Sequence, residues 1–134
     1  MKTPGFLLAA PASGSGKTAA ACALMAAFQE TGRKVRAFKC GPDYIDPMFH
    51  REVLGVESGN LDLFFQNPED LRAYYERSAA GADLSIVEGV MGYYDGMGLD
   101  TEAASSYDTA RTLGLPVILV LPGKGAALTL SATV

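Results

Sequence analysis

Short apolar runs recur along the chain, and longer stretches of helical character separate them. The runs are apolar throughout instead of alternating with polar positions, as in strands that are covered on both faces. We expect strands over Gly5–Ala10, Val35–Lys39, Leu84–Val87 and Pro116–Leu121. Continuous apolar strands of this kind are typical of parallel sheets.

Helical stretches with recognisable ends lie between these runs. We expect helices over residues 17–31, 68–80 and 106–113. A glycine follows each of them, where a left-handed residue commonly ends a helix. The second opens on Asn67–Asp70, an N-cap followed by a proline and two acids. Strands that alternate with helices predict an α/β protein, a three-layer sandwich around a mainly parallel sheet.

The remaining segments are predicted to be irregular. Gly41–Pro47 contains two prolines and two aspartates, and Gly89–Gly98 is rich in glycine, so we expect both to be loops. The residues after Gly125 resemble the start of a helix whose apolar face needs a partner. We therefore expect an incomplete domain, the front of a longer protein.

The loop between the first strand and the first helix, Pro11–Thr18, is a variant Walker A motif. Its glycines let successive backbone N–H groups point at phosphates, and the following helix directs its positive end at them. Lys17 can reach the β and γ phosphates of ATP, and the Thr18 hydroxyl can bind Mg²⁺. The strand before the loop and the helix after it oppose a chance turn and favour a P-loop NTPase fold. The predicted nucleotide-binding residues are Ser13, Gly14, Ser15, Gly16, Lys17 and Thr18.

Charged residues cluster where the predicted strands end. Lys39 ends the second strand, and Asp43 and Asp46 follow it; Glu88 ends the third, and Asp95 follows. Ligands of parallel α/β sheets bind at the carboxyl ends of the strands. Glu88 is therefore placed to hold Mg²⁺, directly or through water. Spacing alone leaves Asp43 and Asp46 open between functional groups and solvated loop carboxylates.

The composition of the chain argues against several classes of protein. The formal net charge is −4 and the basic residues are scattered, which argues against nucleic-acid binding. No apolar stretch is long enough to span a membrane. The cysteines, Cys22 and Cys40, and the single histidine, His50, do not form a zinc or disulfide pattern and fit a reducing cytoplasm. We expect Cys22 to pack in the core and His50, with no partner evident in the sequence, to be structural or exposed.

Four segments, in this order, resemble the cobyrinate a,c-diamide synthases. They are Ala10–Thr18, Phe38–Pro47 with the following Phe49-His50, Asn60–Asp62 and Glu88–Gly96. Four ordered motifs are more specific than a Walker A motif alone. The sister family, cobyric acid synthase, is similar at the phosphate loop but has a different, asparagine-rich segment after the second strand.

The resemblance implies a dethiobiotin-synthetase-like fold and a reaction. ATP and glutamine-derived ammonia would amidate the a and c acetate side chains of a corrin carboxylate substrate through an acyl phosphate. Lys17 and Thr18 would bind phosphate and Mg²⁺, and Glu88 would complete the metal site. Lys39 would stabilise the transferring phosphoryl group. Three aspartates would position substrate, metal or ammonia, with Asp43 also a candidate metal ligand: Asp43, Asp46 and Asp95.

The resemblance also predicts how the protein is organised. Residues 1–134 would form the N-terminal part of an ATP-binding synthetase domain, and the C-terminal glutamine amidotransferase domain would be absent from this chain. Without it, the chain alone is not expected to hydrolyse glutamine, and we expect it to be inactive as an enzyme by itself. Pro122–Gly125 stands where many family members carry an aspartate, so no role is carried over to that loop.

Other functions remain open from the sequence. The substrate can instead be a related tetrapyrrole such as hydrogenobyrinate or nickel-sirohydrochlorin, because the same carboxylate chemistry serves all of them. Dethiobiotin synthetase is a further alternative within the fold. A P-loop switch of the partition-protein class is disfavoured, because Ala12 stands where that class carries a second lysine. The oligomeric state is open, a homodimer included.

Overall fold

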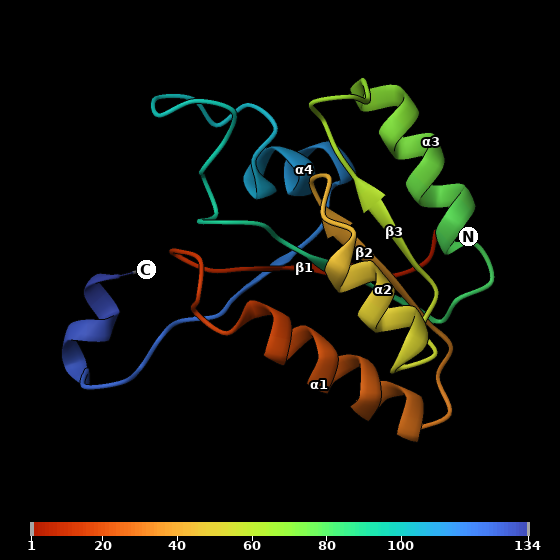
Figure 1. Cartoon of the computed structure of the whole chain (residues 1–134), viewed down its shortest axis with the longest axis horizontal. Helices are drawn as coiled ribbons and strands as arrows, with labels where there is room; N and C mark the ends of the chain where they lie inside the picture. The colour runs from red at the N-terminus through yellow and green to blue at the C-terminus, as the bar shows by residue number, and fades with distance from the viewer. Residues whose placement is uncertain (1, 134) are drawn as a thin grey trace.

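All strands of the central sheet run parallel. The computed structural model describes residues 2–133 and contains a five-stranded sheet in the order β3-β2-β4-β1-β5 (Figure 1). The strands are β1 (Gly5–Ala9), β2 (Val35–Cys40), β3 (Ser58–Leu61), β4 (Leu84–Glu88) and β5 (Val117–Leu119). The helices are α1 (Lys17–Glu30), α2 (Ile45–Glu52), α3 (Pro68–Ala79), α4 (Ser106–Leu113) and the 3₁₀ helix η1 (Leu128–Ala132).

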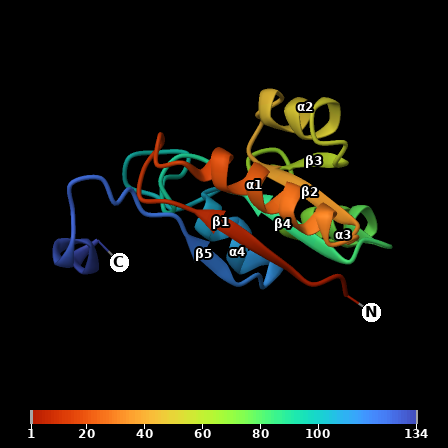
Figure 2. The same cartoon turned by 90° about the horizontal axis from the view of Figure 1, so that it is seen from below.

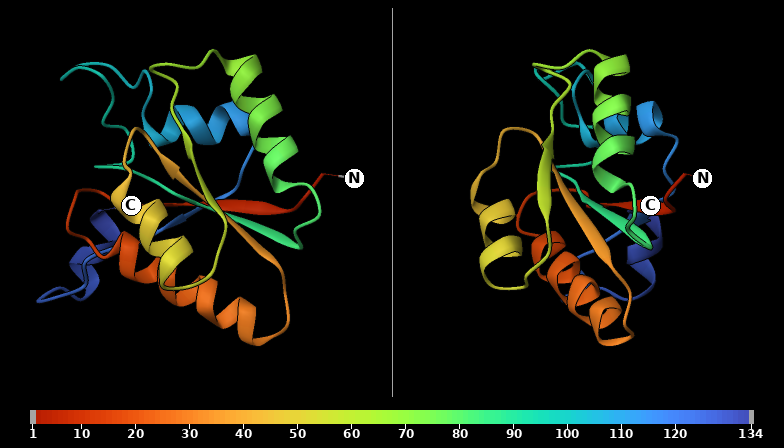
Figure 3. Two further views of the ribbon diagram at one scale, coloured as in Figure 1. Left: turned by 45° about the vertical axis from the view of Figure 1, so that its right-hand side comes forward. Right: turned by 90° about the vertical axis from the view of Figure 1, so that its right-hand side faces the viewer.

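Helices cover both faces of the sheet, so the predicted three-layer sandwich is confirmed. Helices α1 and α2 lie on one face, and α3 and α4 lie on the other (Figures 2 and 3). Met25 of α1 packs with Ile86 of β4 in the core of the first face. Tyr75 of α3 and Leu113 of α4 pack on the opposite face. Burial of apolar side chains in these two cores is the main term that stabilises the fold.

The strand register decides which residues meet at the carboxyl edge of the sheet. Strand β4 lies between β1 and β2, and Glu88 at its end is level with Leu8 of β1 and Lys39 of β2. The loop after β1 and the ends of β2 and β4 are therefore neighbours in space. This register brings three of the predicted site segments together.

The predicted helix ends are confirmed in detail. The Asn67 side chain accepts a hydrogen bond from the Asp70 amide at 2.9 Å, as an N-cap does. Gly114 ends α4 with φ at 65°, in the left-handed region that glycine adopts without strain. Within residues 2–133, none of the helices combines the length and apolar character needed to cross a bilayer.

Two elements, α2 and β3, were not predicted, and the helix expected after Gly125 is of a different type. Residues 41–47 were expected to form a loop, but α2 begins at Ile45 and includes Pro47. Proline is tolerated in the first turn because the amide there has no intrahelical acceptor. Strand β3 went unnoticed because glycine and asparagine at its centre are poor strand formers. The segment after Gly125 forms the 3₁₀ helix η1, not an α-helix.

Candidate active site

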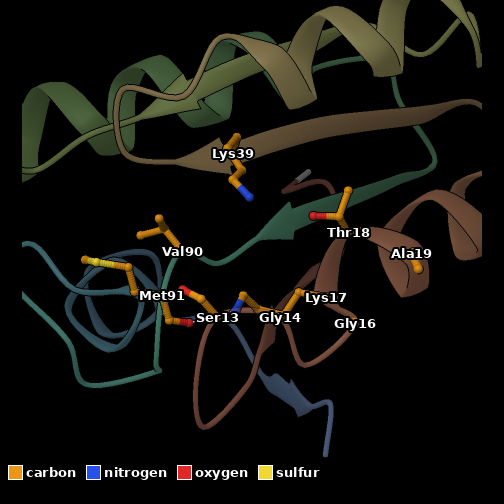
Figure 4. Close-up of a pocket in the computed structure, with 9 residues that line it drawn as sticks. All are labelled: Ser13, Gly14, Gly16, Lys17, Thr18, Ala19, Lys39, Val90 and Met91. Atoms are coloured by element: carbon orange, nitrogen blue, oxygen red, sulfur yellow. Dashed lines mark hydrogen bonds between the residues drawn. The ribbon is translucent and has the colours of Figure 1, made fainter. Parts of the chain in front are cut away.

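The Walker A segment forms a turn around the start of α1. Gly14 and Gly16 have φ of 74° and 96°, a region that side-chain-bearing residues rarely occupy. The turn borders a cavity of about 410 Å³, and Lys39 points into it from the end of β2 (Figure 4). The cavity is lined by Ser13, Gly14, Gly16, Lys17, Thr18, Ala19, Lys39, Val90 and Met91. Ser15 turns away and donates to the Ala12 carbonyl at 2.8 Å.

Lys17 is held at the base of this cavity by backbone carbonyls. Its Nζ donates to the Met91 oxygen at 2.7 Å and to the Ala12 oxygen at 3.3 Å. Burial and the nearby charge of Lys39 lower the pKa of Lys17. Two ammonium groups thus face one cavity at a helix N-terminus, an arrangement that suits an anion such as a phosphate chain.

Lys39 is the centre of a cluster of charges in which Lys39 and Glu88 are buried and the two aspartates are half-buried. Its Nζ lies 2.8 Å from Oε1 of Glu88, 2.7 Å from Oδ2 of Asp46 and 3.8 Å from Oδ2 of Asp43. Burial opposes the charge of Lys39, but the carboxylates of Glu88 and Asp46 raise its pKa above the usual range. The structure therefore brings together four residues predicted from strand ends and from the loop after β2.

Glu88 is fully buried and remains ionised. Burial alone would raise its pKa, but polar contacts from His50, Lys39 and Thr18 hold the pKa at about 2. The Thr18 hydroxyl donates to Oε1, the same oxygen that Lys39 contacts. One carboxylate oxygen thus links the end of β4, the end of β2 and the start of α1.

Magnesium is the metal that the resemblance implies, and this donor set fits it. Mg²⁺ takes oxygen ligands and is usually held by one or two protein groups together with phosphates and water. The Thr18 hydroxyl and the Glu88 carboxylate supply such oxygens beside the phosphate loop. Over residues 2–133 no group of three or more His, Cys, Asp and Glu side chains is arranged to hold a metal.

Two of the predicted acids have other contacts. Asp43 accepts a hydrogen bond from the Ile45 amide at 2.9 Å, which starts α2. Asp95 accepts from the Gly92 amide at 2.8 Å and so shapes the loop after β4. In the described part of the chain Asp95 makes no ion pair or hydrogen bond with Lys39 or Glu88. Its catalytic role, like the metal role of Asp43, stays a prediction.

Sequence reasoning missed residues that support the site. Asn60 of β3 donates to the Gly41 and Asp43 carbonyls at 2.9 and 2.6 Å and fixes the loop after β2. The exposed alternative for His50 is wrong, because the side chain is fully buried and contacts Ser58 at 3.0 Å. Cys22 is half-buried, not a core residue. Only the place of Asn60 within a segment already noted for its resemblance could have signalled its role.

The chain is similar to known proteins over nearly its whole length. Residues 6–124 match the family model of the CobQ/CobB/MinD/ParA nucleotide binding domain. A cobyrinate a,c-diamide synthase from Gloeobacter violaceus is 47% identical over 128 residues, 96% of this chain and 28% of the relative. One from Clostridium tetani is 43% identical over 129 residues, 96% of this chain and 29% of the relative.

A hydrogenobyrinate a,c-diamide synthase from Streptomyces coelicolor is 42% identical over 131 residues, 98% of this chain and 27% of the relative. The chain thus spans less than a third of the length of these relatives. The resemblance to cobyrinate a,c-diamide synthases is confirmed. The family model covers residues 6–124 and includes the phosphate loop. The chain therefore belongs to the CobQ/CobB/MinD/ParA nucleotide binding domain family.

Proposed function

We propose that this chain is the ATP-binding part of a longer enzyme that amidates the a and c acetate side chains of cobyrinate, with glutamine as the nitrogen source. ATP would activate each carboxylate as an acyl phosphate, and ammonia would then displace phosphate. In this proposal the glutaminase function belongs to a separate domain of the full-length protein. The names of the relatives support the substrate class.

One observation supports the proposal most strongly. Thr18 and Lys39 both contact the same carboxylate oxygen of Glu88, Oε1, beside the phosphate loop. Phosphoryl transfer needs in-line positioning and charge neutralisation more than covalent chemistry. A structural ion pair alone would not need a second lysine, Lys17, facing the same cavity. Two lysine ammonium groups at one cavity can neutralise the negative charge that shifts between phosphate oxygens during phosphoryl transfer.

Each residue has a distinct task in this proposal. The backbone amides of the Ser13–Gly16 turn and the Lys17 ammonium bind the phosphate chain. Lys39 lies across the cavity, where it stabilises the transferring phosphoryl group. Thr18 and Glu88 hold magnesium, which when bound neutralises phosphate charge. Asp43 in the loop after β2, Asp46 in the first turn of α2 and Asp95 in the loop after β4 orient the substrate carboxylate or ammonia.

Hydrogenobyrinate is the second candidate substrate, since one relative of similar identity carries that name. The two substrates differ in the metal at the centre of the ring, whereas the site described here acts on carboxylates at the periphery. The residues at the phosphate loop therefore serve both. The choice between them is an outcome of the test below.

The test is an amidation assay with the full-length protein that carries this chain. We would incubate it with ATP, Mg²⁺, glutamine and cobyrinate, and separately with hydrogenobyrinate and nickel-sirohydrochlorin. Mass spectrometry should show two successive replacements of a carboxylate by an amide. ATP hydrolysis without any amide product, on any of the three substrates, would contradict the proposal and favour a P-loop switch.

A matched pair of variants separates a role of Glu88 in the reaction from a general effect of losing one carboxylate. Glu88→Gln should abolish amidation, because the neutral amide neither holds magnesium nor balances Lys39. Glu57→Gln should retain it, since that carboxylate is 76% exposed and pairs with Arg36 at 3.7 Å, away from the phosphate loop. Equal activity of both variants would remove Glu88 from the proposed metal site.

A further inference from the structure

Helix α2 turns a histidine inward and its apolar side chains outward. Its buried residues are Pro47 and His50, whereas Ile45 and Met48 are 78% and 55% exposed. Packing alone would favour the reverse, because apolar burial stabilises and a buried polar group without a partner destabilises. An element that breaks this rule often serves a site, not the core.

Both ring nitrogens of His50 face polar groups on other elements. Nδ1 lies 3.0 Å from the hydroxyl of Ser58 on β3, and Nε2 lies 3.6 Å from Oε2 of Glu88 on β4. His50 and Glu88 are both fully buried. Within the described residues, neither Nε2 nor Oε2 has a hydrogen-bond partner, and their separation of 3.6 Å is slightly too long for a hydrogen bond. Each is thus the group available to satisfy the other.

Glu88 needs a contact on both oxygens to keep one orientation. The terminal torsion of a glutamate side chain is broad, so the carboxylate rotates unless its surroundings fix it. Thr18 and Lys39 both contact Oε1. His50 is the group that faces Oε2. A carboxylate fixed at both ends keeps Oε1 between the helix start and the end of β2.

We propose that His50 is a positioning residue for the nucleotide site. Ser58 donates to Nδ1, which leaves the ring proton on Nε2, and that proton holds Oε2 of Glu88. The Glu88 carboxylate then presents Oε1 to Thr18 and Lys39 in one fixed orientation. The consequence for Mg²⁺ and nucleotide binding rests on the proposed function, but the geometry of the Ser58–His50–Glu88 chain does not.

The first test reads the histidine directly, without nucleotide. His50 is the single histidine of the 134 residues, so a long-range ¹H–¹⁵N spectrum of the ¹⁵N-labelled chain, free of any histidine tag, contains one imidazole. We expect the spectrum to show a proton on Nε2. A neutral ring protonated only on Nδ1 would overturn the proposal, because a bare Nε2 repels the carboxylate.

The second test uses two amides that each imitate one ring nitrogen. In His50→Gln the longer side chain carries its amide to the position of Nε2 and can still donate to Glu88. In His50→Asn the amide reaches only the position of Nδ1, so it bonds Ser58 and leaves Glu88 without a donor. The variants thus have similar polarity and differ in the contact that matters.

Magnesium-dependent affinity for a non-hydrolysable ATP analogue, measured by calorimetry, is the readout. We expect His50→Gln to stay near wild type and His50→Asn to lose about 10–100-fold, the usual effect of removing a support of a metal ligand. Equal losses in both variants would show a packing role and overturn the proposal. The calorimetry uses the full-length protein that carries this chain. If its wild-type form binds no nucleotide, the proposed function fails, and the histidine spectrum still decides the role of His50.

Discussion

Lys39 Nζ lies 2.8 Å from Oε1 of Glu88 because the two residues are register partners at the ends of β2 and β4. The distance between the two side chains is therefore set by the parallel pairing of the strands and does not depend on a loop. Both side chains are almost completely shielded from solvent. The ion pair therefore belongs to the rigid part of the fold, and a site built on strands is held more precisely than one built on loops.

Removal of one partner from this pair should strongly destabilise the fold. In Lys39→Met, Glu88 and Asp46 lose their buried cation, and breaking a buried ion pair costs about 3–5 kcal/mol. We expect urea unfolding to show a loss of this size. The control is Arg111→Met, which removes the exposed pairs with Glu102 and Asp108 and should change stability little. A similar small loss in both variants would show that the Lys39 cluster does not stabilise the fold.

Tyr75 should make stability depend on alkaline pH. Its hydroxyl is buried against that of Ser85, and burial raises the pKa of Tyr75. The phenol therefore ionises first in the unfolded chain as pH rises. The stabilisation is complete below about pH 10, the ordinary tyrosine pKa, and is lost as pH rises through the higher folded value.

Tyr75→Phe tests this dependence. At neutral pH we expect a loss of about 1 kcal/mol, since among the described residues the Ser85 hydroxyl then keeps one long hydrogen bond, to the Pro4 carbonyl at 3.4 Å. Above pH 10 the variant should lose stability less steeply than wild type in urea unfolding. Tyr44→Phe, at a side chain that is 71% exposed, is the control and should follow wild type. Identical slopes for all three proteins would exclude Tyr75 as the source.

The two cysteines should differ in reactivity. Cys40 is buried in β2, and burial raises its pKa to about 12, whereas Cys22 of α1 is half-buried. Thiolates are the reactive species, so an alkylating reagent should modify Cys22 first in the native protein and both equally in denaturant. Peptide mass spectrometry gives the order. Faster modification of Cys40 would contradict its placement in the core.

The phosphate loop and the strand-end charges could be predicted because each is tied to a local pattern. Gly14 and Gly16 are needed for their backbone conformation, and Lys39 and Glu88 follow apolar runs that mark the strands. A strand–loop–helix sequence carries its own signature. The position of these residues at one edge then follows from the topology of parallel sheets.

The support from α2 and β3 could not be predicted in the same way. His50 meets Glu88 across a tertiary contact between two elements, and no spacing along the chain encodes that contact. Ser58 lies on an edge strand without an apolar run, so the strand itself was missed. Pro47 resembled a loop residue because its first-turn position becomes evident only once the helix is known.

Met91 connects the phosphate loop to the loop after β4 at a cost in backbone strain. Its φ of 51° lies in the left-handed region, where a side chain is disfavoured by about 1–2 kcal/mol. Its carbonyl accepts the Lys17 ammonium at 2.7 Å. We infer that this hydrogen bond helps to hold the residue in its strained conformation.

A matched pair of variants measures the strain. Met91→Gly and Met91→Ala both remove a side chain that is 43% exposed, but only glycine adopts this conformation freely. We expect the glycine variant to be more stable than the alanine variant by about 1 kcal/mol in urea unfolding. Equal stability would show that the conformation carries no such cost.

Combination of these variants with Lys17→Met tests what holds the strain in place. If the ammonium holds the Met91 carbonyl, its removal leaves residue 91 free to return to an ordinary backbone conformation. The advantage of glycine over alanine should then shrink in the Lys17→Met background, a coupling that a double-mutant cycle isolates. An unchanged advantage would mean that the fold of the loop alone, and not Lys17, imposes the conformation of Met91. A reduced advantage of glycine over alanine would mean that Lys17 holds Met91 in its conformation. A ligand whose phosphates draw the Lys17 ammonium away from the Met91 carbonyl would then also release the loop after β4.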